Sequence, residues 1–258
     1  MKIAIAGCTG RMGQTLVKAV LANKNVQLVA GSERADFDEK ALRKSLGMDG
    51  IMLTSDAKDL VESADAVIDF TAPEATLCVA REAAKKGSVL IVGTTGFSPD
   101  QQKELQSLGA KARIVQSGNF SLGVCLLEQL VEEAARKLSE AYDIELYEMH
   151  HKHKKDAPSG TALMLGRAAA RGRGVQLDDK KKIDRDGERQ SGDIGFSVAR
   201  GGDVVGIHTV SFAGPGEVIE LKHQGFSREI YAAGAVHAAL WAAKQKPGFY
   251  SMRDVLAS

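Results

Sequence analysis

The chain has 258 residues, 44% of them hydrophobic and 26% charged, and its 34 basic residues nearly balance its 33 acidic ones. This is the composition of an ordinary soluble globular protein with room for one large domain or two modest ones. A formal net charge of +1 provides no overall field for nucleic acid or for a membrane surface, so neither is expected as a partner.

The cysteines and the apolar runs indicate where such a protein works. Cys8, Cys78 and Cys125 lie far apart in apolar or small-residue surroundings, which favours reduced packing thiols and a cytoplasmic protein. No apolar run approaches the roughly 18 residues that a membrane span needs. The chain begins directly with a strand pattern, and no cleavage-site pattern follows it.

The N-terminal segment predicts a strand at residues 2–6, a glycine turn and a helix at residues 14–21. The turn contains Gly7, Gly10 and Gly13 in a GxxGxxG spacing, which differs from the commoner GxGxxG. Such glycines let the backbone approach a pyrophosphate at the helix N-terminus, and the last one lets the helix pack closely on the strand. The pattern predicts a dinucleotide site.

A second strand, residues 27–30, leads to Glu33 and Arg34. Glu33 stands twenty positions after Gly13, where a carboxylate can bond the adenosine ribose hydroxyls. Arg34 can instead meet a 2′-phosphate. We therefore expect NADH, NADPH or both as the cofactor, without a preference that the sequence reveals.

The following segment, residues 37–59, is charged and irregular, and we interpret it as a connection with a short helix and an edge strand near residues 51–54. Residues 66–71 form an apolar strand. Pro73 then starts a helix that Gly87 closes.

The next unit begins with a fully apolar strand, residues 89–92, which runs into Gly93-Thr94-Thr95-Gly96. Ser98 and Gln101 then form a capping box for another helix. Ligands bind at the carboxyl ends of open parallel sheets, so this loop is expected to pass under the nicotinamide half of the cofactor. The alternative is a tight loop with no further role.

A strand at residues 113–116 turns through Ser117-Gly118-Asn119-Phe120-Ser121 into a long helix, residues 122–138. Alternating strands and helices up to about residue 120 imply an α/β fold with a doubly wound, Rossmann-like parallel sheet.

The second half has a different order of elements. It contains a strand at residues 142–150, a helix at residues 160–170 and a charged, turn-rich stretch at residues 175–193. Further strands are expected at residues 196–199, 206–213 and 217–223. These predict a smaller α+β domain with an open mixed sheet. We assign residues 122–228 to this substrate and oligomerisation domain. Residues 1–121 and 229–258 form the dinucleotide domain, onto which a helix at residues 230–243 docks back.

Residues 148–162, EMHHKHKKDAPSGTA, form the most distinctive stretch. Histidine gains and loses its proton near neutral pH, and a lysine crowded by other cations gives up its proton more easily than usual. The stretch can therefore hold proton donors. The free N–H groups of the helix start near Ser159, Gly160 and Thr161 favour a carboxylate or phosphate. An anionic substrate that is protonated during the reaction is predicted.

Three other interpretations of this stretch stay open. A basic run is often a solvated surface turn. A zinc site on His150, His151 and His153 is a second alternative, although no cysteine stands at ligand spacing. A nucleic-acid patch would need aromatic residues interleaved with the charge, and Tyr147 lies upstream of it.

Several motifs together resemble the bacterial dihydrodipicolinate reductase family. They are E-x-H-H-x-x-K-x-D-x-P-S-G-T-A in residues 148–162, the glycine turn with Arg11-Met12, residues 93–97, Asn119-Phe120-Ser121, residues 214–217 and residues 252–256. The resemblance implies reduction of a cyclic dicarboxylate precursor to tetrahydrodipicolinate by NADH or NADPH, in lysine and diaminopimelate biosynthesis. It also implies a homotetramer assembled through the second domain's sheets, and it requires no metal.

Residue roles carried over from the resemblance fall into three groups. His150 resembles the catalytic proton donor and Lys154 its partner. The substrate contacts would be His151, Gly160 and Thr161. The cofactor contacts would be Gly7, Cys8, Thr9, Gly10, Arg11, Met12, Glu33, Arg34, Gly93, Thr94, Thr95, Ser117, Gly118, Asn119 and Phe120. Ser117-Gly118 departs from the alanine or proline usual before Asn-Phe, which puts the stiffness of that loop in question.

Two other functions remain as alternatives. Another NAD(P)-dependent dehydrogenase of amino-acid metabolism would share the first domain but lack the double histidine. A non-catalytic dinucleotide-sensing regulator would keep the glycine turn but have no use for His150 and Lys154.

Overall fold

The computed structural model describes residues 1–34, 43 and 50–257. The chain forms two compact units, of which one comprises Met1–Ser121 with Glu229–Ser258 and the other comprises Leu122–Arg228. The short helix expected after Arg34 falls largely on residues outside the described ranges.

The first unit is built on a parallel sheet with the strand order β12-β6-β5-β4-β1-β2-β3. Its strands are Lys2–Ala6 (β1), Gln27–Ser32 (β2), Met52–Thr54 (β3), Ala66–Asp69 (β4), Val89–Val92 (β5), Arg113–Gln116 (β6) and Gly248–Tyr250 (β12). The order reverses between β1 and β4, which is the switch point where ligands bind in such sheets. The predicted doubly wound sheet is confirmed.

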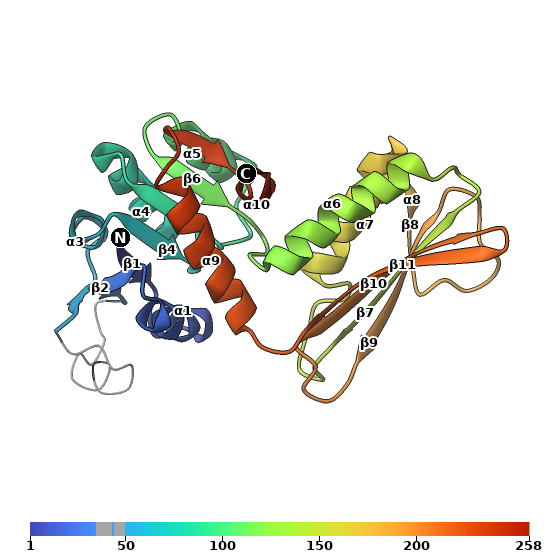
Figure 1. Ribbon diagram of the computed structural model, residues 1–258, viewed down its shortest axis with the longest axis horizontal. Helices are drawn as coiled ribbons and strands as arrows, with labels where there is room; N and C mark the ends of the chain where they lie inside the picture. Colours follow the sequence, from blue (N-terminus) through green and yellow to red (C-terminus); the bar gives the residue numbers. More distant parts are fainter. Residues whose placement is uncertain (35–42, 44–49, 258) are drawn as a thin grey trace. The chain divides into compact units, whose positions relative to one another are not determined.

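Helices cover both faces of this sheet, with α1 and α9 on one face and α3, α4 and α5 on the other (Figure 1). Their bounds are Arg11–Ala22 (α1), Ala57–Ser63 (α3), Pro73–Lys86 (α4), Pro99–Leu108 (α5), Glu229–Ala242 (α9) and Met252–Leu256 (α10). Every residue of β4 and β5 is buried, because strands covered on both faces expose no side. That burial explains the apolar sequence of both strands, which only Asp69 at the end of β4 interrupts.

Two predicted helix signals are confirmed in this unit. Pro73 occupies the first turn of α4, and Gly87 ends the helix in the left-handed conformation with φ +73°. The capping box at the start of α5 pairs Ser98 with Gln101 in both directions.

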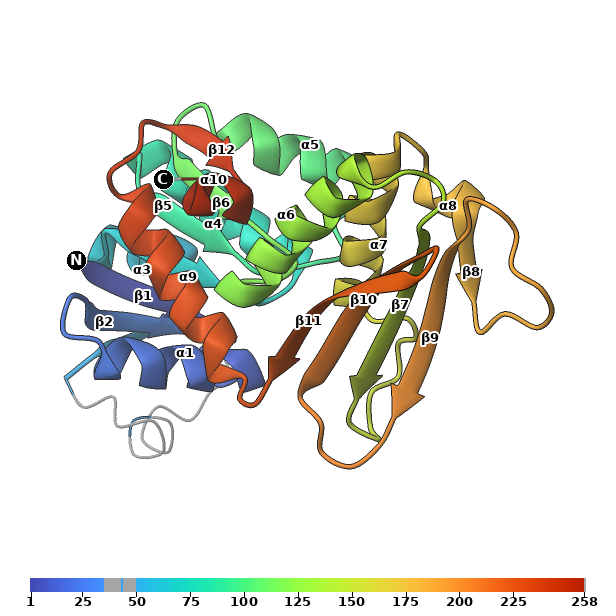
Figure 2. The same cartoon turned by 45° about the vertical axis from the view of Figure 1, so that its right-hand side comes forward.

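The second unit has a mixed sheet in the order β11-β10-β7-β9-β8. Its strands are Asp143–His150 (β7), Lys181–Ile183 (β8), Ile194–Arg200 (β9), Gly206–Gly214 (β10) and Glu217–Gly225 (β11). The helices Leu122–Lys137 (α6) and Gly160–Arg173 (α7) lie side by side on one face of the sheet (Figure 2), and α8 is Leu177–Lys180. The predicted open mixed sheet is confirmed.

Burial alternates along β7, with Ile144, Leu146, Glu148 and His150 buried and the residues between them more exposed. Successive side chains of a strand point to opposite faces. Glu148 and His150 therefore share a buried face with the aliphatic core of the unit.

The structure corrects the sequence interpretation at several short elements. The stretch 175–193, predicted as turns, contains α8 and β8, and α3, β12 and α10 were not predicted. These elements are between three and seven residues long, which is too short for a periodic pattern to appear. Helix α1 begins at Arg11 instead of residue 14 because the glycine turn feeds directly into it.

Candidate active site

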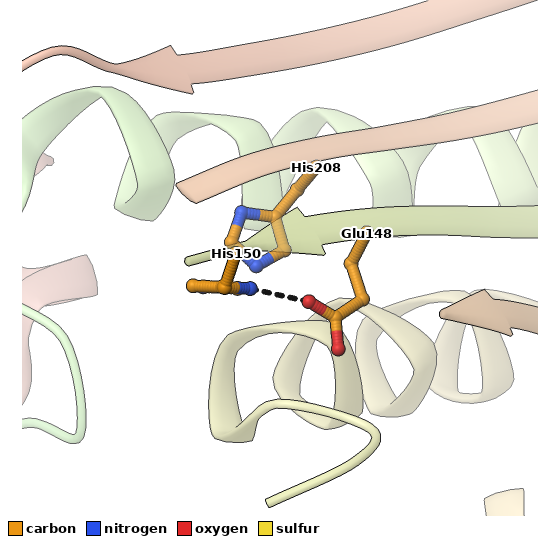
Figure 3. Close-up of side chains that lie close together, drawn as sticks. All are labelled: Glu148, His150 and His208. Carbon is orange, nitrogen blue, oxygen red and sulfur yellow. Dashed lines mark hydrogen bonds and ion pairs between the residues drawn. The ribbon is translucent and has the colours of Figure 1, made fainter. Parts of the chain in front are cut away.

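The carboxylate of Glu148 contacts Nδ1 of His150 on the buried face of β7 (Figure 3). Glu148 is 1% exposed and His150 is 7% exposed. The two residues stand at i and i+2 of one strand, so the pleat holds both side chains on the same side. A buried carboxylate fixes the ring orientation of such a histidine and stabilises its charged form.

The other oxygen of Glu148 is held by two donors. The backbone N–H of Ser159 donates to Oε1 over 2.9 Å, and Nη2 of Arg200 donates over 3.0 Å. Burial by itself raises the pKa of the Glu148 carboxyl, but the hydrogen bonds from His150, Arg200 and Ser159 outweigh it and lower the pKa to about 2. Glu148 is therefore an anion throughout the physiological pH range.

His208 of β10 packs against His150 in this cluster. Its ring meets that of His150 edge to face with centroids 5.0 Å apart, and its Nε2 lies 3.2 Å from the hydroxyl of Ser159. Burial, followed by the charge of His150, lowers the pKa of His208 to about 3. His208 is therefore neutral at pH 7.

The two histidines of the sequence motif, His150 and His151, lie in different environments. His150 is in the buried cluster, whereas His151 lies near the surface, with its Nε2 3.5 Å from Nη2 of Arg228. Nζ of Lys154 pairs with Asp156 at 2.8 Å. The charge of Lys154 contributes to lowering the pKa of both His151 and His208, after burial and nearer charges, so it acts on the same cluster.

The N-terminus of α7 borders the cluster. Ser159 is its N-cap, and its hydroxyl accepts from the N–H of Ala162 over 3.1 Å. Gly160 is exposed with open space where a Cβ would stand, and Thr161 is half-buried. The structure thus brings the predicted substrate contacts Gly160 and Thr161 to the helix end that begins beside Glu148.

Metal binding was one alternative for this stretch. Among the described residues, one group has three potential ligand atoms within 4.8 Å of one another, namely Glu148, His150 and His208. His151 and His153, which the zinc interpretation required, do not belong to it. Because Arg200 already neutralises the carboxylate, the group is poorly suited to a dication.

The predicted dinucleotide turn lies at the carboxyl end of β1. Gly7 has φ +64°, and a Cβ at Gly13 would stand 2.1 Å from the Gly7 carbonyl oxygen. Helix α1 can approach the turn only because Gly13 has no side chain. The hydroxyl of Thr9 donates to Glu33, and its N–H donates to the same oxygen over 3.3 Å.

A pocket of about 450 Å³ opens beside this turn. Gly7, Glu33 and Arg34 line it together with residues at the ends of β2 and β4. Burial raises the pKa of the Glu33 carboxyl, but the bonds from Thr9 and Arg34 lower it below its ordinary value. The pocket therefore offers an ionised acceptor for ribose hydroxyls and a cation beside it, which fits the adenosine half of a dinucleotide.

The remaining predicted cofactor residues lie in loops after β5 and β6. Thr94 is buried and accepts from the hydroxyl of Thr76 over 2.8 Å, whereas Thr95 is exposed. Gly93 lies so close to Phe70 that a Cβ would stand 2.2 Å from the ring. These contacts place the Gly93-Thr94-Thr95 loop at the sheet edge that the glycine turn also occupies.

The loop before α6 is stiffened by its own hydrogen bonds. The hydroxyl of Ser117 donates to the Asn119 carbonyl over 2.5 Å, and Oδ1 of Asn119 accepts from the N–H of Ser121 over 2.8 Å. Phe120 is 1% exposed, with its ring 5.4 Å from that of Phe70. The side chain of Phe120 is therefore part of the core, and only the backbone of this residue is left for a ligand contact. Ser117 replaces the stiffness that proline would give.

Sequence reasoning did not single out Arg200 and His208. Arg200 pairs in register with His150 across β9, and His208 pairs with Glu148 across β10. Which residues of distant strands become neighbours depends on sheet register, which no local motif specifies. Glu148 was part of the recognised motif but had no role assigned.

Comparison with known proteins gives matches over both units. The family model for the N-terminus of dihydrodipicolinate reductase matches residues 1–120, and the model for its C-terminus matches residues 123–256. The 4-hydroxy-tetrahydrodipicolinate reductase of Ruegeria pomeroyi is 49% identical over 98% of this chain and 97% of its own length. That of Afipia carboxidovorans is 48% identical over 99% of this chain and 97% of its own.

A solved structure has the same fold. Dihydrodipicolinate reductase from Paenisporosarcina sp. with dipicolinate bound superposes with a TM-score of 0.80 at 24% identity, covering 97% of each chain.

A glycine turn at the edge of a parallel sheet, with a second unit that gathers a carboxylate, histidines and a helix N-terminus, defines a dinucleotide-dependent oxidoreductase. The family matches extend over nearly the whole chain. The chain belongs to the dihydrodipicolinate reductase family, as its motifs predicted. It is an oxidoreductase of lysine and diaminopimelate biosynthesis with a dinucleotide-binding N-terminal domain. In the described part of the chain, no helix combines the length and the apolar character that crossing a membrane requires.

Proposed function

We propose that this protein reduces the 4-hydroxy-tetrahydrodipicolinate precursor to tetrahydrodipicolinate, with His150 and Lys154 as the groups that protonate the ring. The buried contact between Glu148 and His150 is the observation that carries this assignment. It joins an ionised carboxylate to an imidazole beside the helix end that favours anions. The full family match supports the substrate class.

The substrate is a cyclic dicarboxylate with a carbon–nitrogen double bond conjugated to a carbon–carbon double bond, formed by loss of water from the hydroxylated precursor. When bound, NADH or NADPH would supply a hydride to the ring, and negative charge would then develop toward the ring nitrogen. His150 and Lys154 stabilise that charge and deliver the proton. A donor aimed at developing charge contributes about 3 kcal/mol, roughly 100-fold in rate.

The substrate carboxylates require their own binding groups. Gly160 and Thr161 lie in the first turn of α7, whose N-terminus Ser159 caps with its side chain, and because a helix N-terminus favours an anion, this turn is assigned to one carboxylate. His151, beside Arg228, is assigned to the second. Holding both carboxylates orients the ring toward the proton donor, which accounts for part of the rate.

The cofactor assignment rests on the fit of the first unit. A Cβ at Gly7 would stand 2.7 Å from Thr71, and one at Gly13 would stand 2.1 Å from the Gly7 carbonyl oxygen, so both glycines are needed for the tight turn that a pyrophosphate site requires. Glu33 suits the ribose diol of NADH, and Arg34 suits the 2′-phosphate of NADPH. Both cofactors are therefore assigned as substrates of the enzyme.

We assign the protein to the cytoplasm, in keeping with its free cysteines. A homotetramer assembled through the sheet of the second unit is the proposed assembly. Exposed apolar side chains on that sheet support it, since Val218 is 59% exposed and Tyr147 is 42% exposed. Light scattering during gel filtration tests the assembly, and a monomer at working concentrations would contradict it.

The activity is tested by following the absorbance of reduced nicotinamide after the purified protein meets freshly made product of the preceding aldol condensation. The absorbance is expected to fall in proportion to substrate. A non-catalytic dinucleotide sensor would bind NADH without oxidising it. A dehydrogenase for another amino-acid precursor would leave this substrate unreduced.

A further inference from the structure

The two oxygens of Glu148 have different partners. Oε1 accepts from the N–H of Ser159 and from Arg200, while Oε2 contacts Nδ1 of His150. Nε2 of His150 lies on the other side of the ring, 3.1 Å from the position that a Cβ at Gly206 would take. The neighbour of Nε2 is thus a residue without a side chain, so that no side chain of Gly206 covers this nitrogen.

We infer that Glu148 is a positioning residue for the reaction: it accepts the Nδ1 proton of His150, fixes the ring, and leaves Nε2 to carry the transferred proton. The inference rests on the proton-donor role proposed above for His150. Glu148 does not itself exchange a proton with the substrate. It determines which nitrogen of His150 does so, and it opposes the positive charge that His150 carries before transfer.

The charges around His150 support this assignment. Arg200 and Lys154 are cations near the cluster, and Lys154 is paired with Asp156. His208 is held neutral by burial. Glu148 is thus the carboxylate in direct contact with the His150 ring, so it is the group that stabilises the imidazolium against the other cations.

The substitution Glu148→Gln tests the charge of the side chain while nearly preserving its shape. Ser159 and Arg200 both donate to the Oε1 position, so they require an oxygen there. The amide NH₂ of Glu148→Gln must then face Nδ1 of His150 and donate to it. The substitution therefore removes the negative charge and reverses the tautomer of His150 with little change in side-chain volume.

The kinetic test compares Glu148→Gln with Glu132→Gln. Glu132 is a largely buried carboxylate of α6 that pairs with Arg136 and Arg171 in the same unit, so it controls for the loss of an arginine-paired carboxylate. Glu148→Gln is expected to lower kcat by roughly 100-fold or more, in line with other wrong-tautomer substitutions. Glu132→Gln should retain wild-type turnover.

The pH profile gives a readout that a purely structural role would not change. Proton donation requires charged His150, so turnover falls as the pH rises through the loss of that proton. Without the carboxylate, this alkaline limb should move to lower pH. A lower kcat with an unmoved alkaline limb would contradict the positioning role.

A measurement on the wild-type protein tests the inference even if Glu148→Gln does not fold. With ¹⁵N-labelled histidine, neutral His150 should show its proton on Nδ1 at high pH, with its signals identified by their loss in His150→Gln. An Nε2 proton would overturn the inference. This measurement needs no substrate, so it remains decisive even if the enzyme proves to reduce a different compound. Conversely, an inactive His150→Gln beside a fully active Glu148→Gln would leave the proposed function intact and reject Glu148.

Discussion

The rings of His150 and His208 meet edge to face with centroids 5.0 Å apart, yet their partners differ in charge. His150 contacts an ionised carboxylate, whereas Nε2 of His208 contacts the neutral hydroxyl of Ser159. Nδ1 of His208 has no hydrogen-bond partner within the described ranges. Two adjacent imidazoles therefore have different surroundings, one beside an anion and the other beside a neutral hydroxyl.

His208 should make the folded protein sensitive to mild acid. Burial lowers the pKa of His208 from 6.5 to about 3, so the unfolded chain takes up this proton before the folded one does. Stability from this group is present above pH 6.5 and is lost as the pH falls toward 3. In His208→Gln, the free energy of unfolding between pH 7 and 4.5 should change less steeply, by on the order of a few kcal/mol at most.

Urea denaturation across that range measures the effect. The window above pH 4.5 avoids the region where Glu148, with its pKa lowered to about 2, begins to contribute its own loss. His237→Gln on the exposed side of α9 is the matched control and should keep the wild-type slope. An unchanged slope in His208→Gln would show that His208 is protonated in the folded state.

Removing either proposed proton donor should lower turnover without weakening cofactor binding. His150→Gln and Lys154→Ala are each expected to reduce kcat by tens-fold or more, with little change in the dissociation constant for NADH. Lys155→Ala, a neighbouring exposed lysine, controls for the general loss of positive charge in the loop. Near wild-type turnover in Lys154→Ala would remove Lys154 from the mechanism.

Arg34 and Glu33 should affect the two cofactors in opposite ways. Arg34→Ala is expected to weaken NADPH far more than NADH, by roughly 10- to 100-fold for the loss of a charge-assisted bond. Glu33→Gln should weaken NADH more than NADPH, because the ionised acceptor for the ribose diol is lost. Fluorescence titration of each variant with both cofactors gives the comparison. Equal losses for both cofactors in Arg34→Ala would exclude it from the phosphate site.

Asp69 at the end of β4 should reduce stability at neutral pH. It is fully buried, and burial raises its pKa despite hydrogen bonds from Thr71. Its Oδ2 has no hydrogen-bond partner among the residues that the structure describes. The folded state holds this proton to higher pH than the unfolded chain, so its contribution is favourable in acid and is lost as the pH rises through the raised value.

The substitution Asp69→Asn removes this dependence. The melting temperature of the variant, taken relative to wild type, should therefore rise between pH 5 and pH 8. Asp65→Asn, an exposed carboxylate just before the same strand, should show no such trend. A melting temperature that falls further below wild type at pH 8 than at pH 5 would contradict the sign.

The sequence predicted what is local. The glycine turn, the Pro73 start and the Gly87 end of α4 each depend on a few consecutive residues whose backbone preferences are strong. The pair Glu148 and His150 also follows from a local rule, since alternate residues of a strand share a face.

What the sequence did not predict depends on contacts between distant segments. Arg200 lies 52 positions from Glu148 in the chain, and it reaches the carboxylate because β9 pairs with β7 in one particular register. Likewise, Phe120 belongs to a sequence motif typical of cofactor loops, but its ring is taken up by the core beside Phe70. Burial of that kind depends on the tertiary fold and leaves no local signature.

The alternation along β7 has a consequence for quality control of the folded enzyme. If this strand paired one residue out of step, Glu148 and His150 would both turn away from Ser159, and aliphatic side chains would be left facing water. Such a chain could still be compact and rich in sheet, so spectroscopy would count it as folded. Such a chain would not turn over substrate. The specific activity per mole of folded chain therefore measures the fraction of molecules in which β7 is paired in the correct register.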